Sequence, residues 1–130
     1  MKIFLTGATG FIGKHVAKEA IKRGHSLTCL VRDKSNIADI KLIPARIING
    51  DILDYENLTK QMAGHDAVIH TAGVYRFGPL NVKEMHDVNV KGTENVMLAA
   101  VKVKVAKVVY CGSTITKGDT TKAKTLTHED

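Results

Sequence analysis

A glycine-rich run near the start of the chain constrains its fold more than any other feature. The run TGATGFIG, residues 6–13, follows an apolar segment, Lys2–Thr6, and precedes a helical pattern of apolar residues. In this setting Gly7 permits a tight turn, Gly10 lets the backbone approach a pyrophosphate, and Gly13 lets the helix pack on the strand. The free amides at the helix start would face an anion. The pattern predicts a dinucleotide-binding βαβ unit, with a purely structural glycine turn as the alternative.

The rest of the chain alternates short β-branched runs with helical patterns. Strands are expected at Lys2–Thr6, Ser26–Val31, Arg46–Asn49, Ala67–Thr71 and Lys107–Cys111. Helices are expected after the glycine run up to Gly24, over 37–43, from the cap Asp54 to Gly64, and over about 81–102, with Gly92 packed closely on the sheet. The alternation predicts an α/β fold, a doubly wound Rossmann-type parallel sheet in the order 3-2-1-4-5 that stops after the fifth strand.

Length and composition set the class of protein. The 130 residues, 44% of them hydrophobic, suit about one domain. Apolar runs reach only about six residues, so no membrane span or secretory signal is expected, and the two cysteines, read as small buried hydrophobes, fit a reducing, cytoplasmic setting. The apolar pattern stops after Ser113. We therefore expect a dinucleotide-binding domain at 1–113 and a polar tail at 114–130 leading toward a catalytic and substrate region that the chain lacks.

The net charge of +6 indicates either a solvated basic surface or an anionic small-molecule ligand. Nucleic acid is not an expected partner, because the lysines are dispersed, only 5% of residues are aromatic, and no zinc spacing or basic helix occurs. No metal site is expected either. His65 and His70 lie five residues apart in a strand-like run and should point to opposite faces.

Five runs together resemble the extended short-chain dehydrogenase/reductase family, also called NAD-dependent epimerase/dehydratase. They are TGATGFIG at 6–13, GDILD at 50–54, AVIHTAG at 67–73, NVKGTENV at 89–96 and VVYCGST at 108–114. The resemblance covers nearly the whole chain and is greatest to dihydroflavonol-reductase-like members and nucleotide-sugar epimerases. It implies a hydride-transferring oxidoreductase or nucleotide-sugar epimerase/dehydratase that acts on a small molecule such as a nucleotide sugar or ketone, with a homodimer as a further expectation.

The end of the second strand bears on the form of the coenzyme. A carboxylate there binds the ribose 2′-hydroxyl of NAD, whereas an arginine accommodates the 2′-phosphate of NADP. Val31 occupies the position of the acid, and Arg32 and Lys34 follow it. These residues predict NADP, with NAD as the second choice because Asp33 lies between the two cations; a merely solvated basic turn would leave the preference open.

The resemblance also implies a set of coenzyme-binding residues. Asp51 and Ile52 would flank the adenine, while small residues after the fourth strand would let the backbone pass beside the ribose and phosphates. Asn89 would either order the cleft by hydrogen bonding or lie in water on a helix face. The full expected set is Gly7, Gly10, Phe11, Ile12, Gly13, Arg32, Lys34, Asp51, Ile52, Thr71, Ala72, Gly73 and Tyr75.

The catalytic residues of the family are only partly present. Ser113 matches the family's catalytic serine, and the resemblance implies that it donates a hydrogen bond to the substrate oxygen. The alternative is a loop serine that takes no part in chemistry. The family's Tyr-x-x-x-Lys is absent, since the residues four positions after Tyr55, Tyr75 and Tyr110 are not lysine. The chain alone is therefore expected to be inactive and part of a longer enzyme, with a non-catalytic dinucleotide-sensing regulatory module as the alternative.

Overall fold

The computed structural model describes residues 1–32, 36–75 and 82–113, so Asp33, Lys34 and the tail at 114–130 lie outside the described residues. Five parallel strands form one sheet in the order β3-β2-β1-β4-β5. They are β1 (Lys2–Thr6), β2 (Ser26–Val31), β3 (Arg46–Asn49), β4 (Ala67–His70) and β5 (Lys107–Tyr110). The predicted Rossmann-type sheet and its strand order are confirmed.

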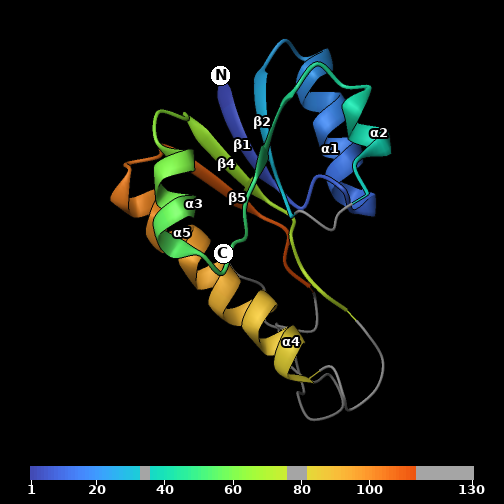
Figure 1. The fold of residues 1–130 in the computed structure, drawn as a ribbon. Helices are drawn as coiled ribbons and strands as arrows, with labels where there is room; N and C mark the ends of the chain where they lie inside the picture. The colour runs from blue at the N-terminus through green and yellow to red at the C-terminus, as the bar shows by residue number, and fades with distance from the viewer. Residues whose placement is uncertain (33–35, 76–81, 114–130) are drawn as a thin grey trace, which may run out of the picture.

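Helices cover both faces of this sheet. The helices α1 (Phe11–Lys22) and α2 (Ala38–Lys41) lie on one face, and α3 (Tyr55–Met62) and α5 (Thr93–Lys102) lie on the other (Figure 1). Neighbouring residues of β1 point to opposite faces, so Leu5 packs in the core beneath α1 while Phe4 packs in the core beneath α3 and α5. Two apolar layers therefore hold the strand ends in a fixed arrangement.

Glycines end two of the helices as predicted. Gly24 and Gly64 follow α1 and α3, and both have a φ of 77°. After α1, the amide of His25 donates to the carbonyl of Ala20 at 3.0 Å, which satisfies a carbonyl of the last turn. At the start of α3, the side chain of Asp54 accepts a hydrogen bond from the amide of Asn57 at 3.1 Å. The predicted cap at Asp54 is confirmed.

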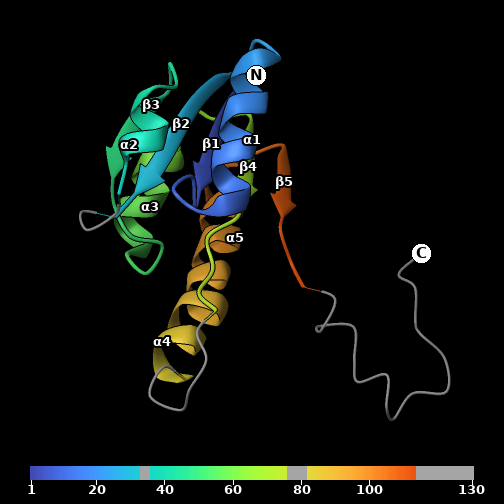
Figure 2. The same cartoon turned by 90° about the vertical axis from the view of Figure 1, so that its right-hand side faces the viewer.

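The long helix predicted over about 81–102 contains an unpredicted π-helical segment. It runs as α4 (Val82–His86), the π-helix η2 (Asp87–Gly92) and α5, and α4 reaches past the end of the sheet (Figure 2). The prediction that Gly92 packs on the sheet is wrong. A Cβ at Gly92 would lie 2.5 Å from Cδ1 of Ile52, so this helix instead presses against the turn after β3.

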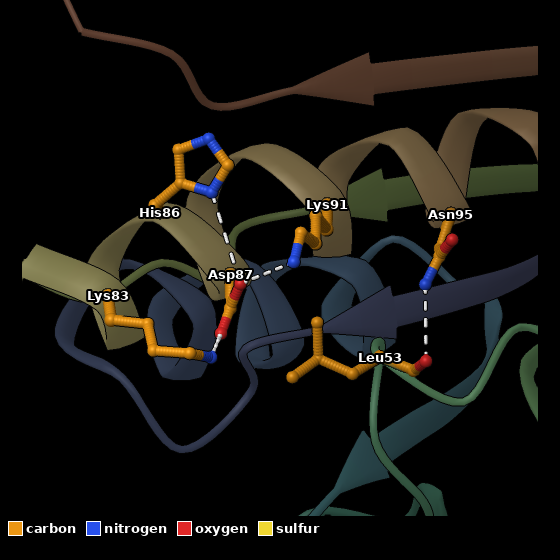
Figure 3. Close-up of polar contacts among 6 residues, drawn as sticks. All are labelled: Leu53, Lys83, His86, Asp87, Lys91 and Asn95. Atoms are coloured by element: carbon orange, nitrogen blue, oxygen red, sulfur yellow. Dashed lines mark hydrogen bonds and ion pairs between the residues drawn. The ribbon is translucent and has the colours of Figure 1, made fainter.

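Ion pairs within this helix and one amide contact to a neighbouring turn stabilise it. The carboxylate of Asp87 pairs with Lys83 one turn before the π-helix and with Lys91 inside it, the latter at 2.8 Å (Figure 3). The hydrogen bonds from the two lysines lower the pKa of Asp87 from 3.8 to about 2. Farther along, Nδ2 of Asn95 donates to the carbonyl of Ile52 at 2.9 Å. The helix is thereby tied to the turn after β3.

Two expectations about burial are wrong. The helical pattern of apolar residues after the glycine run predicts that Ile12 packs with Val16, Ala17, Ala20 and Ile21 on the buried stripe of α1, but Ile12, in the first turn, is exposed. Cys111 was read as buried, yet only Cys29 is; Cys111 follows β5, an edge strand whose four residues are all exposed. Among the described residues β5 is an edge strand with three apolar or aromatic residues, Val108 to Tyr110, and such an edge offers backbone groups for association.

Candidate functional site

A cleft opens where the strands β1, β2, β3 and β4 end. It has a volume of about 240 Å³, and its walls are the turn after β1, the ends of β2 and β3, and the segment after β4. The structure brings together eight of the residues predicted to bind coenzyme. They are Gly7, Gly10, Arg32, Asp51, Ile52, Thr71, Ala72 and Gly73. Their sequence positions are far apart, but parallel strands carry their carboxyl ends to one side of the sheet.

The floor of the cleft is a turn that only glycine can form. Gly7 has a φ of 77°, and a Cβ on it would lie 2.5 Å from the amide nitrogen of Ala72. A Cβ on Gly13 would lie 2.0 Å from the carbonyl oxygen of Gly7, so the first turn of α1 also touches this turn through bare backbone. The amide of Gly10 donates to the same carbonyl at 3.0 Å and closes the turn. Side chains at Gly7 or Gly13 would therefore push apart the elements that surround the cleft.

The start of α1 carries neither of the groups that usually satisfy a helix N-terminus. Its N-cap is Gly10, no described side chain caps it, and its first turn contains no acidic residue. By contrast, α3 has the capping carboxylate of Asp54 and a further acid, Glu56, in its first turn. The first amides of a helix lack partners within the helix. The positive end of the α1 dipole thus remains available beside the cleft for an anion.

The wall formed by the ends of β2 and β3 carries two charged side chains that the sequence predicts to bind the coenzyme. Arg32 follows β2 with an exposed side chain, and Asp51 and Ile52 follow β3. Oδ1 of Asp51 accepts from the amide of Leu53 at 3.0 Å, which holds this turn in shape. Ile52 is 7% exposed, because its side chain also packs against Gly92. The wall therefore offers a cation, a carboxylate and an apolar surface side by side.

The wall after β4 is held by two sets of hydrogen bonds. The amide and the hydroxyl of Thr71 both donate to the carbonyl of Thr6, at 3.2 and 2.8 Å. The side chain of Asn89 accepts from the amide of Val74 at 2.8 Å and donates to its carbonyl at 2.7 Å. Asn89 therefore orders the cleft wall by hydrogen bonding, as one of its two interpretations predicted, and does not lie in water on a helix face. The backbone at 71–74 is thus tied both to β1 and to η2.

Other predicted residues are not part of the cleft lining. Phe11 and Tyr75 are 78% and 77% exposed, and Ile12 and Gly13, in the first turn of α1, are not among the lining residues. Phe11 packs edge-on against His15, with 5.2 Å between the ring centroids. Ser113 lies three residues after β5 and also lies outside the lining. Lys34 falls outside the described residues.

Seven lining residues were not predicted. They are Thr6, Thr9, Leu30, Val31, Gly50, Val74 and Val88. Most of them directly adjoin a predicted residue, so the rule that ligands bind beyond the carboxyl ends of parallel strands would have found them. Val88 is different. It reaches the cleft from η2, and apolar periodicity does not distinguish such a residue from one that packs only in the core.

The described residues contain neither a helix that could span a membrane nor a cluster of metal-binding side chains. None of their helices is both long and apolar enough to span a bilayer. Nor do any three of their His, Cys, Asp or Glu side chains gather in a way that would hold a metal ion.

The comparisons with known proteins point to one family. The family model described as NAD dependent epimerase/dehydratase matches residues 3–130. Human 3 beta-hydroxysteroid dehydrogenase type 7 is 36% identical over 125 residues, 91% of this chain and 34% of its own length. A putative dihydroflavonol 4-reductase of Synechocystis is 30% identical over 110 residues, 85% of this chain and 32% of its own length.

A solved structure agrees with these sequence matches. UDP-glucose 4-epimerase from Brucella ovis, in complex with NAD, superposes with a TM-score of 0.81 and 25% identity over 91% of this chain and 37% of its own. The chain therefore spans about a third of the length of the proteins that it matches.

Proposed function

The chain belongs to the NAD dependent epimerase/dehydratase family, and from this premise we propose that its cleft binds a nicotinamide dinucleotide, with NADP preferred over NAD. The observation that carries the proposal is the glycine turn. Side chains at Gly7 and Gly13 would collide with backbone at 2.5 and 2.0 Å, and the adjoining helix start lacks a capping side chain. Bare backbone amides beside a hollow fit a diphosphate.

The walls of the cleft fit the remaining parts of such a coenzyme. Gly7, Gly10 and the first amides of α1, from Phe11 to Gly13, would hold the diphosphate. Asp51 would accept hydrogen bonds from the adenine ring, against which Ile52 would pack, and the small residues at 71–73 would leave room for ribose. We place Tyr75 at the outer rim of the same cleft as a proposal only, since its side chain lies outside the lining.

The preference for NADP rests on Arg32. This cation lines the cleft directly after β2, and Val31, which ends the strand, offers no carboxylate to a ribose 2′-hydroxyl. Lys34 would add to the cationic side. A guanidinium binds the 2′-phosphate of NADP through charge-assisted hydrogen bonds. NAD has no phosphate at this position. NAD remains the second choice, and the related epimerase was solved with NAD.

Replacement of Arg32 tests this preference. Arg32→Ala should weaken NADPH binding by about 1.5–3 kcal/mol, or roughly 10- to 150-fold, and NADH binding far less. Fluorescence titration of the chain with each coenzyme measures both constants. Arg46→Ala is the matched control, because Arg46 is also exposed but begins β3 at the opposite end of the sheet. Equal losses for the two coenzymes would contradict the assignment.

We propose a hydride-transfer enzyme as the larger context of this domain. The bound nicotinamide would supply or accept the hydride, and Ser113 would donate a hydrogen bond to the substrate oxygen. The substrate would be a small molecule such as a nucleotide sugar or ketone. Because no tyrosine in the 130 residues is followed four positions later by lysine, residues 1–130 alone should show no turnover. Robust oxidation of NADPH by the purified chain with such substrates would contradict this.

The same missing pair favours a second candidate, a dinucleotide-sensing module that regulates a partner without chemistry. A reading frame downstream of codon 130 that encodes Tyr-x-x-x-Lys would favour the enzyme, and a stop codon there would favour the sensor. In either case we propose that residues 1–113 are the binding domain. In the enzyme, residues 114–130 would lead toward a catalytic and substrate region. A cytoplasmic location and a homodimer complete the proposal. The isolated chain should in addition associate through its exposed β5 edge, which a further strand of the complete enzyme would cover.

A further inference from the structure

A buried histidine joins three strands and a helix next to the cleft. His70, the last residue of β4, is 0% exposed. Its Nδ1 lies 2.6 Å from the hydroxyl of Thr6 on β1, and its Nε2 lies 3.0 Å from the hydroxyl of Thr93 on α5. Its ring stacks on Tyr110 of β5, with 5.5 Å between the centroids and 22° between the planes. Both ring nitrogens and one ring face are therefore used.

These four residues come from four of the five runs that carry the family resemblance. Thr6 begins TGATGFIG, His70 lies in AVIHTAG, Thr93 lies in NVKGTENV and Tyr110 lies in VVYCGST. Only Thr6 lines the cleft, and the proposed function uses none of the other three side chains. Runs that are far apart in the sequence thus meet at one ring that has no assigned role.

The chemistry of the contacts suits a fixed link between elements. Burial lowers the pKa of His70 from 6.5 to about 4, so the ring is neutral at ordinary pH. A neutral imidazole has one N–H donor and one acceptor nitrogen, and a threonine hydroxyl can serve either of them. Both hydrogen bonds can therefore form at once, and no buried charge has to be compensated.

The link formed by the hydrogen bonds of His70 to Thr6 and Thr93 reaches the glycine turn through a single residue, Thr6. Thr6 is the last residue of β1, directly before Gly7, and it is 1% exposed. Its carbonyl binds Thr71 of the opposite wall, and its hydroxyl is bound by His70. Through His70 the same point is tied to Thr93, which directly follows the π-helical segment that holds Val74 and Ile52.

We propose that His70 is a positioning residue of the dinucleotide cleft, which sets the glycine turn after β1 against the helix that holds the other two walls. This inference rests on the proposed function, because its effect is measured on coenzyme affinity. Thr93 is the informative partner, since it lies outside the cleft lining and its hydroxyl is hydrogen-bonded to His70. A purely structural role would instead lower stability and leave affinity unchanged.

The chain contains a matched control for this distinction. His65, in the loop before β4, lies 2.9 Å through Nε2 from the hydroxyl of Thr28 on β2, and its ring packs edge-on against Phe4. Thr28 is 7% exposed. The pair has the same chemistry and joins two elements, but neither residue lines the cleft. Its loss should affect folding and not the coenzyme site.

The experiment is a double-mutant cycle read out in coenzyme affinity. The chain and the variants Thr93→Val, His70→Phe and the double variant are titrated with NADPH and with NADH, and urea unfolding without coenzyme gives their stability. We expect Thr93→Val to weaken binding of the better coenzyme about 3- to 10-fold, and the double variant to bind like His70→Phe alone, because the two residues act as one unit. Thr28→Val should change affinity less than about twofold at a similar loss of stability.

Other outcomes overturn the inference. Unchanged affinity in Thr93→Val, or losses that simply add in the double variant, would make His70 a core residue only. If His70→Phe does not fold, His70→Asn takes its place. The shorter asparagine amide can reach Thr6 but not Thr93, so His70→Asn should bind coenzyme as weakly as Thr93→Val does. If the unaltered chain binds neither coenzyme, the proposed function fails together with this inference, whereas intact binding by the unaltered chain confines the failure to His70.

Discussion

The two ends of the sheet use the same local structures for different purposes. Gly7 at the carboxyl end and Gly24 and Gly64 at the amino end all have a φ of 77°. A Cβ on Gly7 would lie 2.5 Å from the amide nitrogen of Ala72, just after β4, whereas a Cβ on Gly24 or Gly64 would have no atom within 4 Å. The amino-end glycines satisfy only a backbone conformation, while Gly7 also permits the turn after β1 to approach the segment after β4 closely.

The two threonine–histidine pairs differ in the same way. His65 and Thr28 link a loop to a strand at the amino end, while His70 and Thr6 link two strand ends beside the cleft. At the carboxyl end the glycine turn packs backbone against backbone beside the cleft, whereas a Cβ at either amino-end glycine would meet no atom within 4 Å. The comparison teaches that close approach, and not turn geometry, distinguishes the coenzyme end of this sheet.

The largest expected effect comes from adding one methyl group at each of these glycines. Gly7→Ala should lower the free energy of unfolding by about 3 kcal/mol or more, because a left-handed residue is combined with overlap against fixed backbone. Gly24→Ala and Gly64→Ala should each cost about 1 kcal/mol, since only the backbone conformation is strained. Urea unfolding of the three variants measures the difference. Similar losses at all three positions would break the comparison.

An effect of similar size is expected from pH. Burial lowers the pKa of His70 to about 4, so between pH 6.5 and 4 the unfolded chain binds a proton that the folded chain does not. Stability from this residue should therefore fall as pH is lowered through that range, by about 3 kcal/mol in all. His70→Asn should remove this part of the slope, and unfolding at a series of pH values measures it. A slope that survives the substitution would assign it to other groups.

The caps of α1 and α3 sharpen the comparison at a smaller scale. Asp54→Ala removes the side chain that caps α3 and should cost about 1 kcal/mol of stability. Coenzyme affinity should not change, because Asp54 lies outside the cleft lining. Chemical unfolding and titration with NADPH on the same preparation test both parts. A loss of affinity would show that the helix opposite the glycine turn also takes part in the site.

The smallest effect is expected at the helix that reaches beyond the sheet. Asp87→Asn removes the ion pairs with Lys83 and Lys91 and should lower stability slightly at neutral pH. Because these lysines lower the pKa of Asp87 from 3.8 to about 2, the difference from the unaltered chain should shrink as the pH falls through that range. Thermal unfolding at several pH values would detect it. A difference that persists at the acid end would contradict the ion-pair explanation.

The sequence predicts the strands and the position of the cleft better than it predicts contacts between helices and turns. The strands follow from short runs of β-branched and apolar residues, and Asp51 and Thr71 reach the cleft because they lie within two residues of the carboxyl end of a strand. Apolar periodicity carries no signal for a π-helical segment, so the partner of Gly92 was assigned to the sheet and is in fact Ile52. The partners of His70 were missed for the same reason, since no local pattern records which threonines a distant histidine meets.

The central claim is that the cleft at the carboxyl ends of the strands binds the coenzyme, and backbone amide resonances test it most directly. On titration of the labelled chain with NADPH, we expect saturable shifts at residues 7–13, 30–32, 50–52 and 71–74, with those at the amino-end turns around Gly24 and Gly64 unchanged. Shifts confined to other surfaces, or none at coenzyme concentrations far above the expected Kd, would contradict the account.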